Sequence, residues 1–493
     1  MPFSAQLGSE PVSEELRWLS TRELVAKIAT KEISAREALD DHLARIDALN
    51  PAINAVVTRD DEAALARAGA ADEAVAKGEP IGPLHGVPMT HKDTHDTAGL
   101  RTTWGSPIMA DRIPDSDSLI ISRLKAAGVN TTGKTNVPEF AAGSHTFNPV
   151  FGTTVNPYDT SKSASGSSGG VGAVLAAGIQ ASGDGSDMGG SLRSPASFNN
   201  VVGFRPSNGR IPHTLPGNPF AWLAQSGFMA RTVSDVALAM SAASGPEPGG
   251  PRSISEPGSV FDLPEFGLGA DIEPDLSGVK IGFSPDLNGL LPVEGEVHEI
   301  VAGTADVLSS LGAGVVDTIP NLGDADEVFN VRRALDFVYS WGPLLEKHPD
   351  QIKDSVVWNI EMGLKLTGAD VVSADRARAR LYGEIERFFG EHDLLVLTTC
   401  QVLPFDATIE YPTEINGVGL ENYLDWMRAL CLISATGCPA VSVPAGFSES
   451  GLPVGVQLVA KPGADVDLLR MAHAFEAATQ IHRRHPQLSA PMP

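Results

Sequence analysis

The chain has 493 residues, of which 42% are hydrophobic and 20% charged, so a sizeable buried core is expected and bulk disorder is not. Lys and Arg total 36 against 61 Asp and Glu, and a formal net charge of -25 would repel a phosphate backbone, which argues against nucleic acid as a partner.

The start of the chain lacks the basic and apolar regions of a secretory signal, and apolar runs fall short of the ~18 residues that span a bilayer. We therefore expect no membrane span and a cytoplasmic location. Cys400, Cys431 and Cys438 show no CxxC spacing and are interpreted as core thiols.

The first region, residues 14–80, is predicted to consist of N-terminal helices. Ser20 with Glu23 and Ser34 with Glu37 form two capping boxes, in which each side chain satisfies the other residue's backbone donor at a helix start. The second helix is expected to stop at Asn50-Pro51, because proline disfavours continuation of a helix.

A catalytic core is predicted over residues 83–245. Short apolar runs at 86–89 and 130–134 enclose a helical stretch at 119–127, which is the rhythm of parallel α/β packing. The sheet is therefore expected to begin in this region. Residues 163–200 are rich in Ser, Gly and Ala, which indicates a need for close backbone approach.

The remaining regions alternate between connection, helices and strands. Residues 246–279 contain many Pro and Gly and predict a surface connection, whereas 296–390 predict a mostly helical cover. The last region, 393–480, is expected to hold strands and a closing helix. Its strands are predicted at 393–399, 438–447 and 452–460, the last two adjacent, after an earlier strand at 279–284.

Two serine motifs carry the candidate chemistry. In ASGSSGGVGAVLAAG, Ser167 and Ser168 lie in a glycine-rich turn before a small-residue helix; taken alone, this motif is more simply a capped helix, and it lacks the lysine of a phosphate loop. Ser191 follows 24 positions after Ser167, within GSDMGGSLRSPASF. Consecutive amide N–H groups after two glycines can converge on one oxyanion, so this segment predicts an oxyanion hole.

A serine nucleophile needs a base, and none of the 12 histidines falls within either serine motif. The segment HGVPMTHKDTHDTAGLRTTWGS places Lys92 at the end of an apolar run, where burial would lower the lysine pKa. The alternative is a surface ion pair of Lys92 with Asp93 or Asp96, the more common fate of a lysine. Spacing alone does not decide between the two.

These motifs, together with GKTNVPEF and VGFRPSNGR, resemble the amidase signature family, which includes fatty-acid amide hydrolase and the A subunit of glutamyl-tRNA amidotransferase. The resemblance covers most of residues 15–245 and resumes over 393–480. It implies a single large α/β domain, with a mixed twisted sheet covered by helices on both faces. It also implies a nucleophile at Ser191, a proton relay at Ser167 held by a cis peptide after Gly166, and a base at Lys92.

The same resemblance assigns supporting positions. The oxyanion amides map onto Met188, Gly189, Gly190 and Ser191, while Asp187, Ser186 and Arg193 match positions that brace the loop. Ser168 is expected to form hydrogen bonds within the network. Family members usually have a glycine where this chain has Ser165, so the turn before Ser167 is expected to be slightly altered. The residues that match the acyl pocket are Phe140, Ala141, Ala142 and Gly143, whose mostly small side chains predict a wide pocket.

The implied reaction is acyl transfer to water through an acyl-enzyme on Ser191, without cofactor or metal. Carboxamides, anilides and carbamates (urethanes) are the expected substrates, and the lack of an Arg or Lys cluster near the motifs favours neutral ones. One alternative is a glutaminase-type A subunit of an aminoacyl-tRNA amidotransferase. Another is a catalytically silent binding protein on the same fold. The sequence leaves the oligomeric state open, with a homodimer as one possibility.

Overall fold

The computed structural model of the chain describes residues 14–270 and 273–488. Residues 1–10, on which the prediction about a secretory signal rests, lie outside these ranges. Among the described residues, none of the helices is long and apolar enough to cross a bilayer. The helices are α1 (Glu14–Arg17), α2 (Thr21–Ala29), α3 (Ala35–Ile53), α4 (Asp61–Lys77), α5 (Leu119–Ala126), α6 (Gly169–Ala176), α7 (Arg193–Phe198), α8 (Val233–Ala243), α9 (Gly295–Ser310), α10 (Ala325–Lys347), α11 (Asp354–Lys365), α12 (Gly368–Phe389), α13 (Arg428–Thr436) and α14 (Asp465–Thr479).

The largest sheet has eight strands, in the order β12-β11-β13-β17-β16-β9-β10-β8. Strand β11 runs parallel to β12 and β13, and the other neighbours are antiparallel, so the sheet is mixed. The strands are β1 (Val56–Arg59), β2 (Pro88–Lys92), β3 (Asn130–Thr135), β4 (Phe147–Asn148), β5 (Gly152–Thr153), β6 (Val155–Asn156), β7 (Asp159–Ser163), β8 (Ser182–Asp187), β9 (Val202–Arg205), β10 (Gln225–Ala230), β11 (Lys280–Phe283), β12 (Gly314–Val316), β13 (Leu394–Thr398), β14 (Glu414–Ile415), β15 (Val418–Gly419), β16 (Ala440–Phe447) and β17 (Pro453–Val459).

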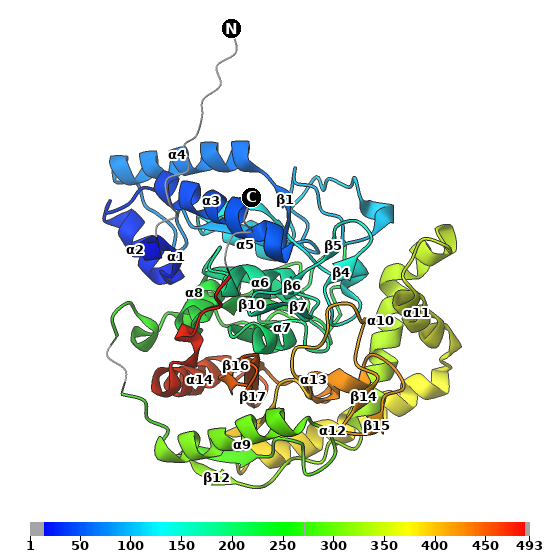
Figure 1. Ribbon diagram of the computed structural model, residues 1–493. Coiled ribbons are helices and arrows are strands. Elements are labelled where there is room, and N and C mark those ends of the chain that lie inside the picture. The colour runs from blue at the N-terminus through cyan, green and yellow to red at the C-terminus, as the bar shows by residue number, and fades with distance from the viewer. Residues whose placement is uncertain (1–13, 271–272, 489–493) are drawn as a thin grey trace.

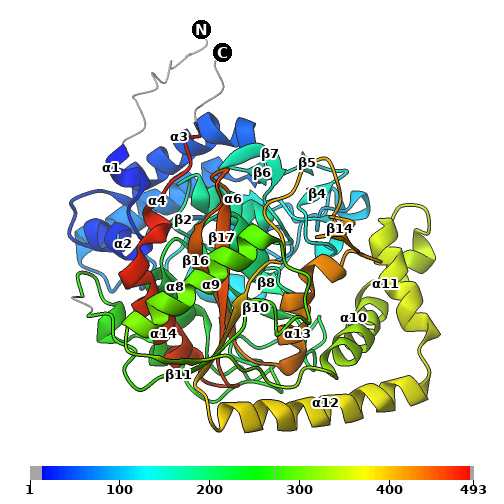
Figure 2. The same cartoon turned by 60° about the horizontal axis from the view of Figure 1, so that its bottom comes forward.

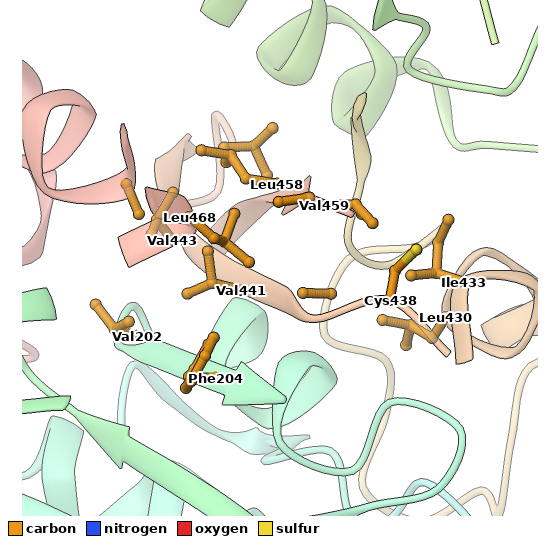
Figure 3. Close-up of a cluster of buried hydrophobic side chains, with 14 of the residues drawn as sticks. Val202, Phe204, Leu430, Ile433, Cys438, Val441, Val443, Leu458, Val459 and Leu468 are labelled. Carbon is orange, nitrogen blue, oxygen red and sulfur yellow. The ribbon is translucent and has the colours of Figure 1, made fainter. Parts of the chain in front are cut away.

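Helices cover both faces of this sheet, with α6 and α7 on one side and α9 on the other (Figure 1). The predicted α/β fold class is therefore confirmed. Strands β16 and β17 pair antiparallel, as their two adjacent apolar runs predicted. Their side chains meet those of β9 and α13 in the main core, where Phe204, Val441, Leu458 and Leu430 are buried together (Figure 3).

The strands of the first part of the predicted core lie outside the large sheet. Strands β2 and β3 are parallel, as expected, but they form a separate three-stranded sheet with β1. The expectation that the sheet begins here was therefore wrong for the large sheet. The reason is that β3 is paired on both sides, by β1 and β2, and β2 faces the edge strand β8 through side chains rather than through a β-ladder.

Both predicted capping boxes are present at the starts of α2 and α3, at Ser20 and Ser34. The predicted stop at Asn50-Pro51 was wrong, because α3 continues through Pro51 to Ile53. A proline in the last turn removes only one hydrogen bond, and the buried Ile53 side chain anchors that turn. The helix is capped by Asn54, whose N–H donates to the carbonyl of Asn50 and whose left-handed backbone (φ 50°) ends the helix after Ile53.

Helices α10, α11 and α12, named the helical cover below, lie together on one flank of the molecule (Figure 2). Most described residues of the segment 246–279 are exposed or half-buried, but a few buried side chains anchor it. Phe261 and Phe266 in this segment are fully buried and pack into the main core beside helix α8. Proline and glycine therefore mark irregular backbone here, while the two aromatic side chains fix the segment to the protein.

Candidate active site

Lys92 ends strand β2 and is fully buried. Its Nζ donates a hydrogen bond of 2.8 Å to Ser167 Oγ and another of 3.0 Å to Ser186 Oγ. Burial lowers the pKa of Lys92 to about 7, although the negative charges of Asp187 and Asp184 oppose the shift. A substantial share of the molecules therefore carries a neutral amine at neutral pH, and a neutral amine can accept a proton.

The surface ion pair of Lys92 is not formed, because the two nearby carboxylates have other partners. Asp96 is bound by both terminal nitrogens of Arg112, at 2.7 and 2.6 Å. Asp93 is buried and accepts hydrogen bonds from the hydroxyl and the backbone N–H of Thr103. The position of Lys92 is thus that of an internal amine rather than of a solvated cation.

The two serine loops are tied to each other by backbone contacts. The N–H of Ser168 donates to the carbonyl of Ser191 at 3.2 Å, and Ser194 Oγ lies 3.0 Å from the carbonyl oxygens of both Gly166 and Gly190. The peptide bond between Gly166 and Ser167 is cis. Ser191 is 8% exposed, so the candidate nucleophile lies in a nearly closed site.

Ser165 and Ser168 differ in how they contribute to these loops. Ser165 stands where glycine is usual in the resembled family, and it adopts a left-handed backbone with φ 60°. Its Oγ donates to the carbonyl of Ser144 at 3.3 Å, which stabilises the turn without a glycine. The hydroxyl of Ser168 was expected to join the hydrogen-bond network, but it is buried and has no partner among the described residues.

A buried ion pair holds the nucleophile loop from beneath. Arg193 binds both carboxylate oxygens of Asp187, at 2.9 and 3.0 Å. Burial by itself would raise the pKa of Asp187, but Arg193, Arg205 and the N–H of Gly190 hold it well below its usual range. The N–H of Gly190 already donates to Asp187 at 2.8 Å, so among the four amides predicted to bind an oxyanion the candidates are those of Met188, Gly189 and Ser191.

A family model described as Amidase matches residues 37–469, which include both serine loops and Lys92. The chain belongs to the amidase family. An acylamidase from Rhodococcus erythropolis is 34% identical over 467 residues, covering 94% of this chain and 96% of the relative. The A subunit of the glutamyl-tRNA(Gln) amidotransferase from Moorella thermoacetica is 35% identical over 500 residues, covering 96% and 99%. The crystal structure of a bacterial aryl acylamidase of the amidase signature family superposes with a TM-score of 0.87 at 28% identity, covering 97% and 100%.

The helical cover reaches the nucleophile loop of this amidase, which the sequence motifs did not indicate. A Cβ on Gly189 would lie 2.7 Å from Phe329 Cζ of helix α10, and a Cβ on Gly190 would lie 2.4 Å from Leu430 Cδ1 of α13. Both glycines are therefore required by packing, and Gly190 is also required by its backbone conformation, with φ 110°. The only signal in the sequence was the pair of glycines itself.

Arg333 of α10 is a second contribution from the cover that sequence reasoning missed. It is buried, it donates to the Sδ of Met188 at 3.1 Å and to Asn359 Oδ1 at 3.0 Å, and it also donates to the hydroxyl of Tyr423. The sequence showed no Arg or Lys cluster near the motifs, and the folded chain adds the buried cation of Arg333 beside Met188. Arg333 also lines a cavity of about 540 Å³ between α10, α11 and the segment 418–431.

The segment that matches the acyl pocket is more filled than its small side chains predicted. The ring of Phe140 packs 4.3 Å from that of Trp341, and Trp341 meets Trp104 at 5.1 Å. Ala142 is fully buried, and the backbones of Phe140 and Ala141 are left-handed, with φ of 50° and 57°. The cover helix α10 therefore supplies an aromatic wall here, with Gly143 at its edge beside Lys353.

A cluster of buried ionisable groups lies behind Lys92. Asp184 of β8 accepts from His91 Nδ1 at 2.5 Å, from His95 Nδ1 at 2.6 Å and from the backbone N–H of Lys92 at 3.2 Å. Burial would raise the pKa of Asp184, but the two imidazoles lower it below its usual range. The signal in the sequence was an aspartate among the small residues of SGDGSD, with two histidines flanking Lys92.

Proposed function

We propose that this amidase hydrolyses amides through Ser191 as nucleophile, Ser167 as proton relay and Lys92 as base. The observation that carries the proposal is the hydrogen bond of 2.8 Å from the buried Lys92 Nζ to Ser167 Oγ, in a loop tied to that of Ser191. A lysine whose pKa is lowered to about 7 can serve as a base at neutral pH, where an ordinary lysine is protonated.

The proposed cycle begins with the neutral amine of Lys92. Ser191 attacks the substrate carbonyl carbon and passes its proton to Ser167, while Ser167 passes its own proton to Lys92. The tetrahedral oxyanion receives hydrogen bonds from backbone N–H groups at Met188, Gly189 and Ser191. When the C–N bond breaks, Ser167 protonates the leaving nitrogen and is reprotonated by Lys92, and water then hydrolyses the acyl-enzyme by the same route in reverse.

Supporting residues keep this geometry fixed. The Asp187–Arg193 pair and the hydroxyl of Ser194 link the nucleophile loop to the Gly166 turn and to helix α7. Ser186 shares Lys92 Nζ with Ser167, which limits the positions that the amine can take. These residues support the reaction without taking part in proton transfer.

The substrate class that we propose is neutral carboxamides and anilides, with carbamates as a further group. One relative is an acylamidase and a similar structure is that of an aryl acylamidase, and the aromatic wall of Phe140, Trp341 and Trp104 suits an aryl group. A cytoplasmic location remains a prediction from the sequence, with which the three free and buried thiols agree. The division of the chain into N-terminal helices, catalytic core, cover and C-terminal strands also remains a prediction from the sequence.

A glutaminase activity is the second candidate, because the A subunits of glutamyl-tRNA(Gln) amidotransferases are similar over nearly the whole chain. The purified chain alone, assayed for ammonia release from glutamine and for aniline release from an acetanilide, separates the two. We expect anilide hydrolysis without added partners. Ammonia release from glutamine at a higher kcat/KM would favour the second candidate.

A fluorophosphonate probe tests the nucleophile directly. We expect one label per chain on Ser191, identified by peptide mass spectrometry, and loss of anilide hydrolysis in proportion to labelling. Labelling should be absent in Ser191→Ala and retained in a control variant, Ser241→Ala, which removes a half-buried hydroxyl of helix α8. A label on another residue, or full activity after complete labelling, would remove Ser191 from its role, whereas the absence of both labelling and activity would favour the silent binding protein.

A further inference from the structure

The candidate base and the candidate nucleophile belong to different sheets. Lys92 ends β2 of the three-stranded sheet, and the nucleophile loop follows β8, the edge strand of the eight-stranded sheet. Strands β2 and β8 share no β-ladder. Their relative position, on which the proton path from Ser191 to Lys92 depends, must therefore be set by other contacts.

Side chains take the place of the missing ladder at two points. Gln180 Oε1 accepts from the backbone N–H of Thr90 at 3.0 Å and from its hydroxyl at 2.6 Å, while Gln180 Nε2 donates to the carbonyl of Ser182 at the start of β8. Two residues further along β2, Asp184 accepts the backbone N–H of Lys92. Together these two side chains bind β2 at every second residue, as a neighbouring strand would.

The Asp184 contact differs from that of Gln180 because its carboxylate is charged and also binds two imidazoles. His91 precedes Lys92 on β2, and its Nδ1 binds Asp184 of β8. Its other ring nitrogen lies 2.9 Å from Thr131 Oγ1 of β3, so this ring connects β2, β3 and β8. His95 lies in the turn after β2, and that turn is held by Lys134, whose Nζ donates to the His95 carbonyl at 2.5 Å. Asp184 and His91 are fully buried, and a buried carboxylate is stable only when it is saturated with donors in this way.

We infer that Gln180 and Asp184 form a side-chain clamp that positions Lys92 against the serine loops, with Asp184 as the positioning residue closest to the base. The inference rests on the proposed function, because it assigns a role relative to Lys92 as base. Neither residue has a hydrogen bond to Ser167 or Ser191, so both act through Lys92 and the strand that carries it. Such clamps matter because a small misplacement of a reacting group lowers the rate strongly.

The charge of Asp184 gives the clamp a signature that a purely structural role would not have. The charged and titratable groups around it are His91 on β2, His95 in the next turn, Lys134 on β3, and Lys92 and Asp187 on the side of the serines. Asp184 and Asp187 both raise the pKa of Lys92 against the effect of burial. Removing the charge of Asp184 should lower the pKa of Lys92 further, so the rising limb of kcat/KM should move to lower pH.

The test compares Asp184→Asn with Asp235→Asn in the full-length enzyme. Asp235 of helix α8 is also fully buried and also accepts two backbone N–H groups, from Thr21 at 2.8 Å and Arg22 at 3.2 Å, but it has no contact with Lys92 or the serine loops. We expect Asp184→Asn to lower kcat for an anilide on the order of tenfold or more, with KM little changed and the rising limb at lower pH. Asp235→Asn should lower only the Tm.

Gln180→Met provides the second measurement and decides the matter if Asp184→Asn does not fold. It removes the contact with Thr90 but no charge, so kcat should fall while the pH midpoint stays in place. Wild-type kcat in folded Gln180→Met, or wild-type kcat and pH midpoint in folded Asp184→Asn, would overturn the inference. Failure of the proposed function is a separate result, since it would appear as retained activity in Ser191→Ala, whatever the clamp variants do.

Discussion

The serine loops and the helical cover meet at Met188 and Gly189, but different interactions hold them in place. The loops are fixed by buried polar contacts, such as the Asp187–Arg193 pair and the hydrogen bonds of Ser194. The cover, α10–α12, reaches the same point mainly with large side chains, Phe329 against Gly189 and Trp341 against Phe140. Chemistry therefore depends on the first region, and we expect substrate shape to be set by the second.

The largest effect is expected when the candidate nucleophile of the serine loops is removed. Ser191→Ala should reduce anilide hydrolysis on the order of 10⁴-fold or more with an unchanged fold, because it deletes one oxygen from a loop that other contacts hold. Initial rates and circular dichroism of the variant and of Ser241→Ala measure both parts. Activity of Ser191→Ala within tenfold of the wild type would contradict the assignment.

Neighbouring serines should differ in effect. Ser167→Ala removes one of the two hydroxyl acceptors of Lys92 Nζ and, with it, the proposed relay, so it should cost about 10³-fold in kcat/KM. The hydroxyl of Ser168 has no partner among the described residues, and its loss should cost less than about tenfold. The two variants have the same change in composition, so each is the control for the other. Equal losses would show that the Lys92 contact does not define the relay.

Glycine-to-alanine changes compare the two regions directly. Gly190→Ala introduces a Cβ 2.4 Å from Leu430 Cδ1 at φ 110°, so kcat/KM should fall on the order of 100-fold and the Tm should fall as well. Gly383→Ala in the exposed face of α12 meets no atom within 4 Å and should stabilise the helix by about 1 kcal/mol without changing activity. Thermal unfolding and kinetics of both variants are the measurement. A tolerated Gly190→Ala would mean that the loop is not held against Leu430 of α13.

The smallest effect is expected in the cover itself. Trp341→Leu should raise KM for an anilide about threefold to tenfold with kcat nearly unchanged, because it shortens the aromatic wall without reaching the reacting atoms. Tyr339→Leu on the same helix replaces an exposed aromatic ring and is the matched control. A larger loss in kcat than in KM would place Trp341 with the loops rather than with the cover.

The same division explains what the sequence could predict. The capping boxes at Ser20 and Ser34, the strands β16 and β17 and the two serine motifs are local patterns, and each can be recognised from a few consecutive residues. Phe329 and Arg333 could not be assigned in this way, because their periodicity on α10 predicts that they are buried but not which loop they contact. Pro51 shows the opposite case, since a local rule ended a helix that the burial of Ile53 prolongs.

Asp184 lies between these cases. Its residue type is unusual in a strand of small residues, but its partners His91 and His95 are about ninety positions away, and the sequence does not show that β2 and β8 lie side by side without a ladder. Separate sheets are a property of the whole topology. Only the folded chain therefore shows that a carboxylate contacts the backbone N–H of Lys92.

The pH dependence of Lys92 tests the central claim most directly. A base must be neutral at the start of the cycle, and burial lowers the pKa of Lys92 to about 7, so kcat/KM for an anilide should rise with pH through about 7 and be lost in acid. We would measure kcat/KM for a matched anilide and activated aryl ester between pH 5 and 10 at constant ionic strength, for the wild type and Lys92→Ala. The account predicts that Lys92→Ala loses several orders of magnitude with the anilide and less with the ester, and that the rising limb disappears. An unchanged pH profile in Lys92→Ala, with both rates reduced only a few-fold, would show that the base lies elsewhere.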